Sequence, residues 1–182
     1  RYFGKNGKKQ EIHSQEETNK ILENIKNAKY TVTEVKKGER KRTPAPPFTT
    51  STMQQEASRK LGFTLKKTMS VAQGLYEGVA IKGRGTLGLI TYLRTDSTRI
   101  SEEAKQSAAE YIKENYGEDY LNQEEKSKKN SKKIQDAHEA IRPSYVDLTP
   151  AQVKESLSRD QFRLYQLIWK RFLASQMSAA KY

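Results

Sequence analysis

The sequence predicts a mainly α-helical protein with a few short β-strands. Most apolar residues recur every three or four positions between capping residues, as in amphipathic helices. Alternation of apolar and polar residues is confined to short runs, residues 31–35 and 81–94. Two short helical stretches precede the second run, and together they have the outline of a winged-helix unit, a shape associated with DNA.

The first 49 residues hold one short helical pattern and little apolar sequence. Ile21, Leu22 and Ile25 fall on one side of a helix, and residues 31–35 are expected to form a strand. A basic turn or edge follows, and three of the five prolines then lie within residues 43–48. Because proline keeps itself and the preceding residue extended, we expect a domain boundary there.

Helical spacing dominates after the prolines. Met53, Ala57 and Leu61 recur at every fourth position, with threonines available as N-cap and Gly62 as C-cap. A second helix lies between Phe63 and Gly78, and the side chains expected to face inward are Leu65, Met69, Ala72, Leu75 and Tyr76. The run 81–94 then predicts two strands around the sequence KGRG, comparable to a wing.

The last third of the chain predicts three more helices. One begins after Ser101, and the capping boxes TPAQ (149–152) and SRDQ (158–161) begin the others. The aromatic residues of the last helix are interpreted as core rather than as a base-stacking platform. Residues 122–133 contain no apolar residue and are interpreted as a solvated loop, although their lysines could also follow a phosphate backbone.

Composition favours a polyanionic partner. The formal net charge is +12, and charged residues make up 31% of the 182 residues. Nucleic acid is therefore expected before a membrane surface. The chain has no cysteine, which excludes disulfides and cysteine-based zinc sites, and its two histidines lie far apart in sequence. No apolar run approaches the roughly 20 residues that span a bilayer, and we expect a piece of a larger intracellular protein because the first residue is not Met.

The most informative stretch is LGLITYLRTDST, residues 87–98. In an extended chain Tyr92, Arg94 and Asp96 share one face, while leucines occupy the other. The phenol of a free tyrosine has a pKa near 10 and needs help to attack a phosphate. A guanidinium can bind phosphate oxygens through two hydrogen bonds, and a carboxylate can orient that guanidinium. Spacing alone also fits a strand tyrosine beside a surface ion pair.

A second group of polar residues lies in QDAHEAIRPS, residues 135–144. His138 and Arg142 are four apart and share a side if this segment is helical. Pro143 then predicts that such a helix ends near Arg142. The pair could position a phosphate or move a proton, and His138 could equally well only bond to nearby backbone.

These stretches resemble one family. LITYLRTDSTRIS (89–101) is very similar to the tyrosine motif of type IA DNA topoisomerases, and QDAHEAIRPS resembles their downstream histidine motif. PPFTTSTMQQEASRKLGF (46–63) is similar to the segment that precedes the tyrosine in bacterial topoisomerase I. The three matches occur in the family's order and fit topoisomerase I better than topoisomerase III. Reverse gyrase is a relative that these motifs do not cleanly exclude.

The resemblance implies a chemistry and a role for particular residues. Tyr92 matches the nucleophile that forms a 5′-phosphotyrosyl link before strand passage and religation, without ATP. Arg94 matches the arginine that stabilises the scissile phosphate, and His138 the histidine that contacts DNA phosphate. Asp96 is a polar neighbour of the tyrosine. Further candidates for phosphate contact are Thr95, Ser97 and Arg142.

The resemblance also implies what these residues lack. The family's Toprim domain, which binds Mg²⁺, has no counterpart in the sequence, nor has most of the strand-binding domain. Residues 50–178 are expected to form the tyrosine-bearing domain, and residues 1–49 part of a β-rich arch domain to which residues 179–182 begin to return. No metal ligand is expected here, and the piece alone should be a monomer without activity. We expect a cytoplasmic, nucleoid-associated protein that acts on single-stranded or negatively supercoiled DNA.

Two other functions stay open from the residues. A winged-helix regulator would read DNA without chemistry, although only Lys66, Lys67 and Gln73 of the second helix suggest base readout. A tyrosine recombinase would need a different histidine-to-arginine spacing from that of His138 and Arg142, and its tyrosine would follow them.

Overall fold

The computed structural model describes residue 3 and residues 7–32, 34–122 and 138–182. These residues divide into two units, Arg1–Gly38 and Glu39–Tyr182. The first unit has a single helix among its described residues, α1 (Gln15–Lys26), which begins at the N-cap Ser14 and buries no side chain. No helix in the described part of the chain is long and apolar enough to cross a membrane.

The strand expected at residues 31–35 is wrong. Its four described residues lie outside any strand, and Val32 and Val35 are exposed. A strand needs a partner for its backbone groups and a core for one face. None of the described residues of the first unit is a buried apolar residue, so the alternation has no core to order it.

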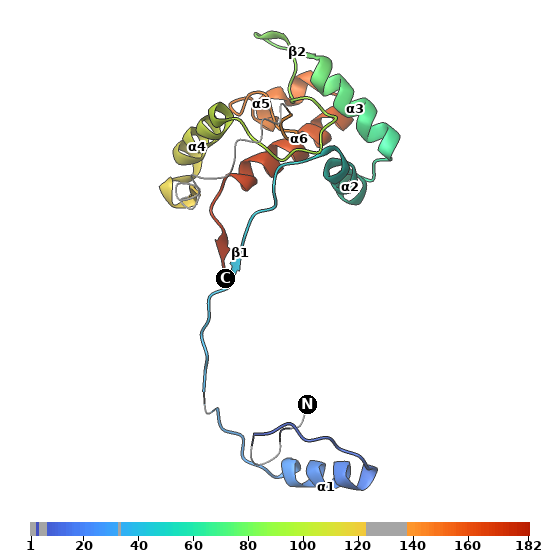
Figure 1. Cartoon of the computed structure of the whole chain (residues 1–182), viewed down its shortest axis with the longest axis vertical. Helices are drawn as coiled ribbons and strands as arrows, with labels where there is room; N and C mark the ends of the chain where they lie inside the picture. The colour runs from blue at the N-terminus through green and yellow to red at the C-terminus, as the bar shows by residue number, and fades with distance from the viewer. Residues whose placement is uncertain (1–2, 4–6, 33, 123–137) are drawn as a thin grey trace. The chain divides into compact units, whose positions relative to one another are not determined.

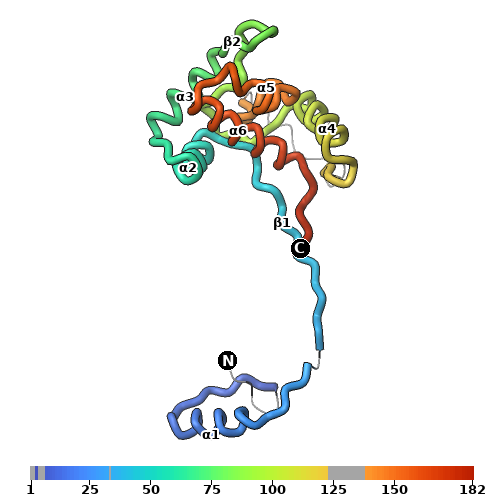
Figure 2. The backbone as a smooth tube through the Cα atoms, turned by 180° about the vertical axis from the view of Figure 1, so that it is seen from behind, coloured from blue at the N-terminus to red at the C-terminus, as the bar shows by residue number. Residues whose placement is uncertain are grey.

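The second unit is mainly helical, as the sequence predicts. Its helices are α2 (Thr50–Leu61), α3 (Leu65–Glu77), α4 (Glu102–Tyr116), α5 (Pro150–Val153) and α6 (Arg159–Ser175), with 3-10 turns η1 (Glu118–Tyr120) and η3 (Lys154–Ser156). Helix α6 lies between α2 and α3 on one side and α4 on the other (Figure 1, Figure 2). It is the central element, and six of its side chains are buried: Leu164, Tyr165, Ile168, Trp169, Phe172 and Leu173.

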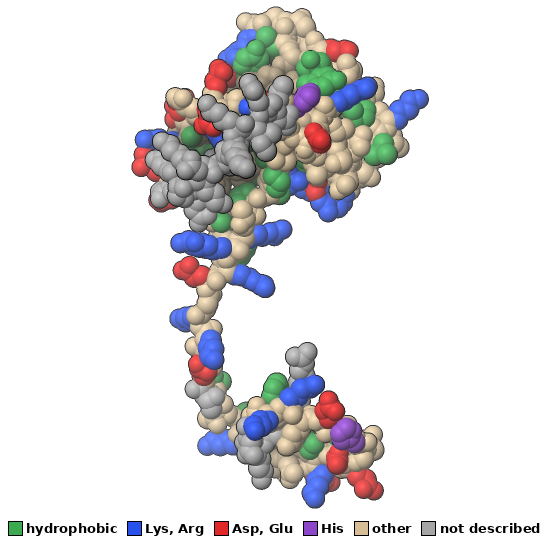
Figure 3. All heavy atoms as spheres, viewed as in Figure 1, with side chains coloured by type: hydrophobic (Ala, Val, Ile, Leu, Met, Phe, Trp, Pro, Cys, Tyr) green, Lys and Arg blue, Asp and Glu red, His purple; other side chains and the backbone are tan. Residues whose placement is uncertain are grey.

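The described strands form two antiparallel pairs. Strand β1 (Lys41–Arg42) pairs with β4 (Ala180–Lys181), and β2 (Val79–Ile81) pairs with β3 (Gly85–Leu87). The first pair brings together the two ends of the helical body (Figure 1). Basic and acidic side chains both project from the extended segment that contains β1 (Figure 3). The second pair is the predicted wing, but its last strand ends at Leu87, seven positions earlier than the run 81–94 suggests.

The capping residues define the helices correctly. Helix α2 has Gly62 at its C-cap with φ 69°, the left-handed conformation that glycine adopts without strain. The boxes at Thr149 and Ser158 are both present at the starts of α5 and α6. Ser101 caps α4, whose buried residues are Ala104, Ala108 and Ile112. These local hydrogen bonds depend on residues close in sequence, which is why the sequence predicts them.

The inward face of α3 differs from the expectation. Leu65 is 61% exposed and Tyr76 is 38% exposed, whereas Thr68 is fully buried. The hydroxyl of Thr68 donates to the carbonyl of Thr64 at 2.9 Å, so a polar residue enters the core at little cost. The buried stripe is therefore Thr68, Ala72 and Leu75. The solvated loop predicted at 122–133 lies outside the described residues, except for Asn122.

Candidate active site

The tyrosine lies on an irregular loop that follows β3. Residues 88–100 form no strand, contrary to the extended run that the sequence predicts through residue 94. The expected alternation is nevertheless present around the tyrosine, because Leu93 and Thr95 are buried while Tyr92, Arg94 and Asp96 are exposed. Tyr92 is 47% exposed. The phenol, the guanidinium and the carboxylate are therefore all accessible to a ligand.

The first residue of α2 holds one side of this loop. The backbone N–H of Thr50 donates to the carbonyl of Thr95 at 2.9 Å. The hydroxyl of Thr50 accepts from the N–H of Thr95 at 2.8 Å and lies 2.8 Å from the carbonyl oxygen of Leu93. The loop is thus joined to a helix that begins more than forty residues earlier.

The segment 138–144 holds the other side. The N–H of Thr91 donates to the carbonyl of Arg142 at 3.0 Å, and the hydroxyl of Thr91 donates to the carbonyl of Ala140 at 2.7 Å. Single β-bridges pair Ile90 with Pro143 and Phe48 with Ile141. Residues 46–50, 89–95 and 140–144, distant in sequence, thus meet at one place. These are parts of the three stretches that resemble one family.

The end of α3 fixes the start of the loop. A Cβ atom added at Gly88 would lie 2.6 Å from the carbonyl oxygen of Tyr76, so only glycine fits this approach. The rings of Tyr76 and Tyr92 meet edge to face, with centroids 5.5 Å apart. The helical pattern predicts that Tyr76 is buried. Its side chain is instead partly exposed, and its ring contacts the ring of the candidate nucleophile.

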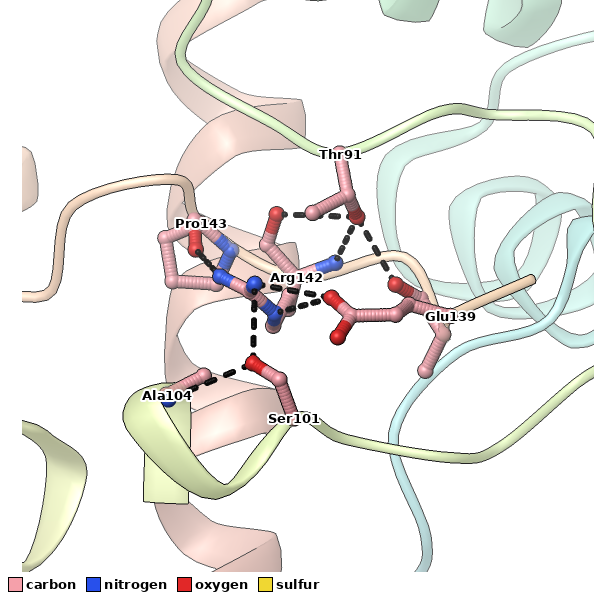
Figure 4. Close-up of polar contacts among 7 residues, drawn as sticks. Thr91, Ser101, Ala104, Glu139, Arg142 and Pro143 are labelled. Atoms are coloured by element: carbon pink, nitrogen blue, oxygen red, sulfur yellow. Dashed lines mark hydrogen bonds and ion pairs between the residues drawn. The ribbon is translucent and has the colours of Figure 1, made fainter. Parts of the chain in front are cut away.

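Arg142 makes several contacts within the protein (Figure 4). Its Nε and one terminal nitrogen donate to the carboxylate of Glu139 at 3.0 and 2.7 Å, and the other terminal nitrogen donates to the carbonyl of Pro143 at 3.0 Å. The guanidinium also lies 3.5 Å from the hydroxyl of Ser101, the cap of α4. Its side chain is only 14% exposed. This geometry orders the segment around Pro143, and a phosphate contact by Arg142 stays a prediction.

His138 is exposed and begins the described part of its motif. The described residues 138–144 are not helical, so the spacing of four does not place His138 and Arg142 on one face of a helix. The bridges to Phe48 and Ile90 explain this, because they take up backbone groups that a helix would use internally. The phosphate roles of His138, Thr95 and Ser97 also stay predictions. The hydroxyl of Thr95 accepts from the N–H of Ser97 at 3.0 Å, and that of Ser97 from the N–H of Arg99.

Sequence reasoning missed Thr50 and Thr91 as part of this site. The sequence pattern offers Thr50 only as one of the threonines that could cap a helix, and Thr91 falls on the apolar face of the alternating run. A hydroxyl that bonds to backbone forty or more residues away leaves no periodic signal. Among the described residues, no group of three or more histidine and acidic side chains is arranged to hold a metal ion.

The helical fold and the three motifs that meet at the tyrosine loop indicate one class of protein. The sequence profile of the DNA topoisomerase family matches residues 1–182. The chain belongs to this family, and the resemblance to bacterial type IA topoisomerases is confirmed. Among solved structures, it is similar to full-length topoisomerase I from Thermotoga maritima, with 44% sequence identity and a TM-score of 0.73. The match covers 96% of this chain and 27% of the Thermotoga maritima chain.

Proposed function

We propose that this chain is the tyrosine-bearing part of a topoisomerase I that relaxes negatively supercoiled DNA, with Tyr92 as its nucleophile. One observation carries the proposal. In a member of the topoisomerase family, a half-exposed tyrosine stands on a loop that is hydrogen-bonded on both sides to distant segments. A nucleophile needs both access to its substrate and a fixed position.

The reaction is a reversible exchange of ester bonds. The phenolic oxygen of Tyr92 attacks a DNA phosphorus and loses its proton, and the bond from phosphorus to the 3′ oxygen breaks. The 3′ oxygen takes up a proton, and the 5′ phosphate stays on the tyrosine. The other strand passes through the gap before the 3′ hydroxyl reverses the attack. Because the phosphotyrosyl ester keeps the bond energy, ATP is not required.

Arg94 is the residue that we propose to assist this attack. It lies two positions from Tyr92, is exposed like it, and can donate two hydrogen bonds to phosphate oxygens as charge develops. Asp96 is also exposed, and we propose that it orients that guanidinium when a phosphate is bound. His138 contacts a DNA phosphate near the site. Thr95, Ser97 and Arg142 contribute further phosphate contacts.

We propose that magnesium binds outside these 182 residues. The described residues do not fit a metal site, because no cluster of suitable ligands lies among them. The ion is therefore proposed to bind a Toprim domain of the complete enzyme, and no step at Tyr92 is derived from it. We expect the 182 residues alone to be monomeric and inactive, since they match only 27% of a topoisomerase I chain. The complete protein is proposed to act in the cytoplasm at the nucleoid.

A chimera tests the proposal. This chain replaces the matching segment of the Thermotoga maritima enzyme, and a labelled single-stranded oligonucleotide reports covalent adduct formation. We expect an adduct with the chimera and none with its Tyr92→Phe variant. Tyr116→Phe is the matched control, because Tyr116 is 46% exposed and belongs to α4 rather than to the loop.

Two results would contradict the assignment. An adduct that persists in Tyr92→Phe would show that another group is the nucleophile. A folded chimera that binds the oligonucleotide but never forms an adduct would favour the binding-module alternative.

A further inference from the structure

The hydroxyl of Thr50 is not used by its own helix. Thr49 caps α2 and accepts from the N–H of Thr52 at 3.3 Å, while the hydroxyl of Thr52 accepts from the N–H of Thr49 at 2.9 Å. This reciprocal box already provides the side-chain cap of α2. The hydroxyl of Thr50 is therefore available for a different purpose.

That hydroxyl binds the two peptide groups on either side of Arg94. It accepts from the N–H of Thr95 at 2.8 Å, and it shares its single proton between the carbonyls of Leu93 at 2.8 Å and Thr95 at 3.1 Å. The N–H of Thr50 donates to the same Thr95 carbonyl. The backbone that carries Arg94 is thereby fixed to the start of a helix.

A second hydroxyl acts on the opposite side of Tyr92. The hydroxyl of Thr91 donates to the carbonyl of Ala140 and accepts from the N–H of Arg142 at 3.0 Å (Figure 4). Both sequence neighbours of Tyr92 are thus attached to distant segments. Thr91 is bonded to residues 140–142, and Leu93 is bonded to Thr50. This double attachment holds the backbone that carries Tyr92 and Arg94 without any regular secondary structure in the loop.

We propose that Thr50 is a positioning residue, which sets the placement of Arg94 relative to Tyr92 through backbone hydrogen bonds, with Thr91 completing the attachment. This inference rests on the proposed function of Tyr92 and Arg94. In-line attack on a phosphate requires the nucleophile and the stabilising cation to be held in one geometry. Removal of the hydroxyl leaves the N–H of Thr95 and the carbonyl of Leu93 to find other partners, while the carbonyl of Thr95 keeps the N–H of Thr50, so the loop relaxes.

The chain offers a matched set of variants. Thr50→Val removes the hydroxyl and keeps the shape, and Thr50→Ser restores the hydroxyl. Thr52→Val is the control, because it removes a hydroxyl of the same helix turn that bonds only within residues 49–52. Both valine variants affect the start of α2, but only the first changes the loop.

Amide hydrogen exchange of this chain tests the attachment without any activity. We expect the N–H of Thr95 to exchange at least about tenfold faster in Thr50→Val, and at the original rate in Thr50→Ser and Thr52→Val. Unchanged exchange in Thr50→Val would overturn the inference.

Single-turnover adduct formation in the chimera tests the positioning role. Thr50→Val should lower the rate at saturating oligonucleotide by about 10- to 100-fold and change the oligonucleotide Kd by less than about twofold. Thr50→Ser should recover the rate, and Thr52→Val should keep it. An unchanged rate in Thr50→Val, or an equal loss in Thr52→Val, would overturn the inference.

The two proposals fail in different ways. If Tyr92→Phe still forms the adduct, the proposed function is wrong, and the positioning role falls with it even if exchange at Thr95 responds as expected. If Tyr92→Phe is inactive while Thr50→Val reacts normally, only the positioning role is wrong.

Discussion

Tyr92 and Tyr165 are held in opposite ways. Tyr165 lies in the middle of α6, is fully buried, and donates its hydroxyl to the carbonyl of Leu148 at 2.6 Å. Tyr92 lies on an irregular loop, is 47% exposed, and is held through the backbone of its neighbours. Burial immobilises a phenol by removing it from any substrate. Attachment through neighbouring residues leaves the phenol free to react.

Burial also affects the protonation of Tyr165. Burial, and secondarily the charge of Asp147, raises the pKa of Tyr165 above its ordinary value. A phenol in that environment is a poorer source of phenolate and serves as a structural donor. Tyr165 is therefore part of the core, and Tyr92 is the tyrosine for which we propose a chemical role, so variants at each should affect only one of these properties.

Tyr165→Ala should have the largest effect. The side chain packs in the core with Leu164, Ile168 and Phe172, and its removal leaves a cavity. We expect a loss of about 3–5 kcal/mol in the free energy of unfolding, measured by urea denaturation of this chain. Tyr116→Ala is the control and should change stability little, because Tyr116 is exposed. Equal losses in the two variants would contradict the role of Tyr165 in the core.

Arg94→Ala should impair chemistry and leave the fold intact. Loss of one donor to the developing charge typically slows such a reaction about 10²- to 10³-fold, measured here as adduct formation by the chimera. The melting temperature should stay within about 2 °C, because surface substitutions are usually nearly neutral. Arg84→Ala, at the exposed β2–β3 turn, should keep the original rate. A normal rate in Arg94→Ala would remove Arg94 from the mechanism.

Tyr165→Phe should cost much less than alanine. The ring stays, and only the hydrogen bond to the Leu148 carbonyl is lost. We expect a decrease of about 1 kcal/mol in the free energy of unfolding, with adduct formation unchanged in the chimera. A large fall in the adduct rate would show that α6 and the tyrosine loop are coupled.

The smallest effect should be a pH dependence above pH 10. An unfolded tyrosine ionises near pH 10, whereas the raised pKa of buried Tyr165 keeps it protonated in the folded chain. The stability contributed by Tyr165 is complete below pH about 10 and falls as the pH rises further, because the unfolded chain then binds fewer protons. Denaturation at pH 8 and 11 should show a smaller decrease for Tyr165→Phe. An identical decrease would assign the effect to other groups.

Much of the helical body could be predicted, because its signals are local. The box beginning at Ser158 and the left-handed Gly62 each involve residues at most a few positions apart. The inward face of α3 could not be predicted as well, since the buried Thr68 depends on its bond to Thr64. The strand expected at 31–35 is wrong because the described residues of its unit provide no buried core for an apolar face.

The sequence predicts which residues form the candidate site, but it does not predict the contacts that hold them in place. Tyr92 and Arg94 come from their spacing and from the resemblance, and the structure places both on the surface. Their catalytic roles remain predictions. The contacts of Thr50 with the loop, and of Arg142 with Ser101, depend on which segments meet in space.

By itself, the sequence determined the helices, the family, and the exposed side chains at Tyr92, Arg94 and Asp96. These features follow from capping, periodicity and motif residues, which act over a few positions. Only the tertiary structure decided that the loop is irregular, that Thr50 and Thr91 attach it, and that Tyr76 meets Tyr92. A hydrogen bond between residues forty or more positions apart exists only after the helices have packed. The sequence therefore predicts which tyrosine is the candidate nucleophile, and the packed fold determines how it is held.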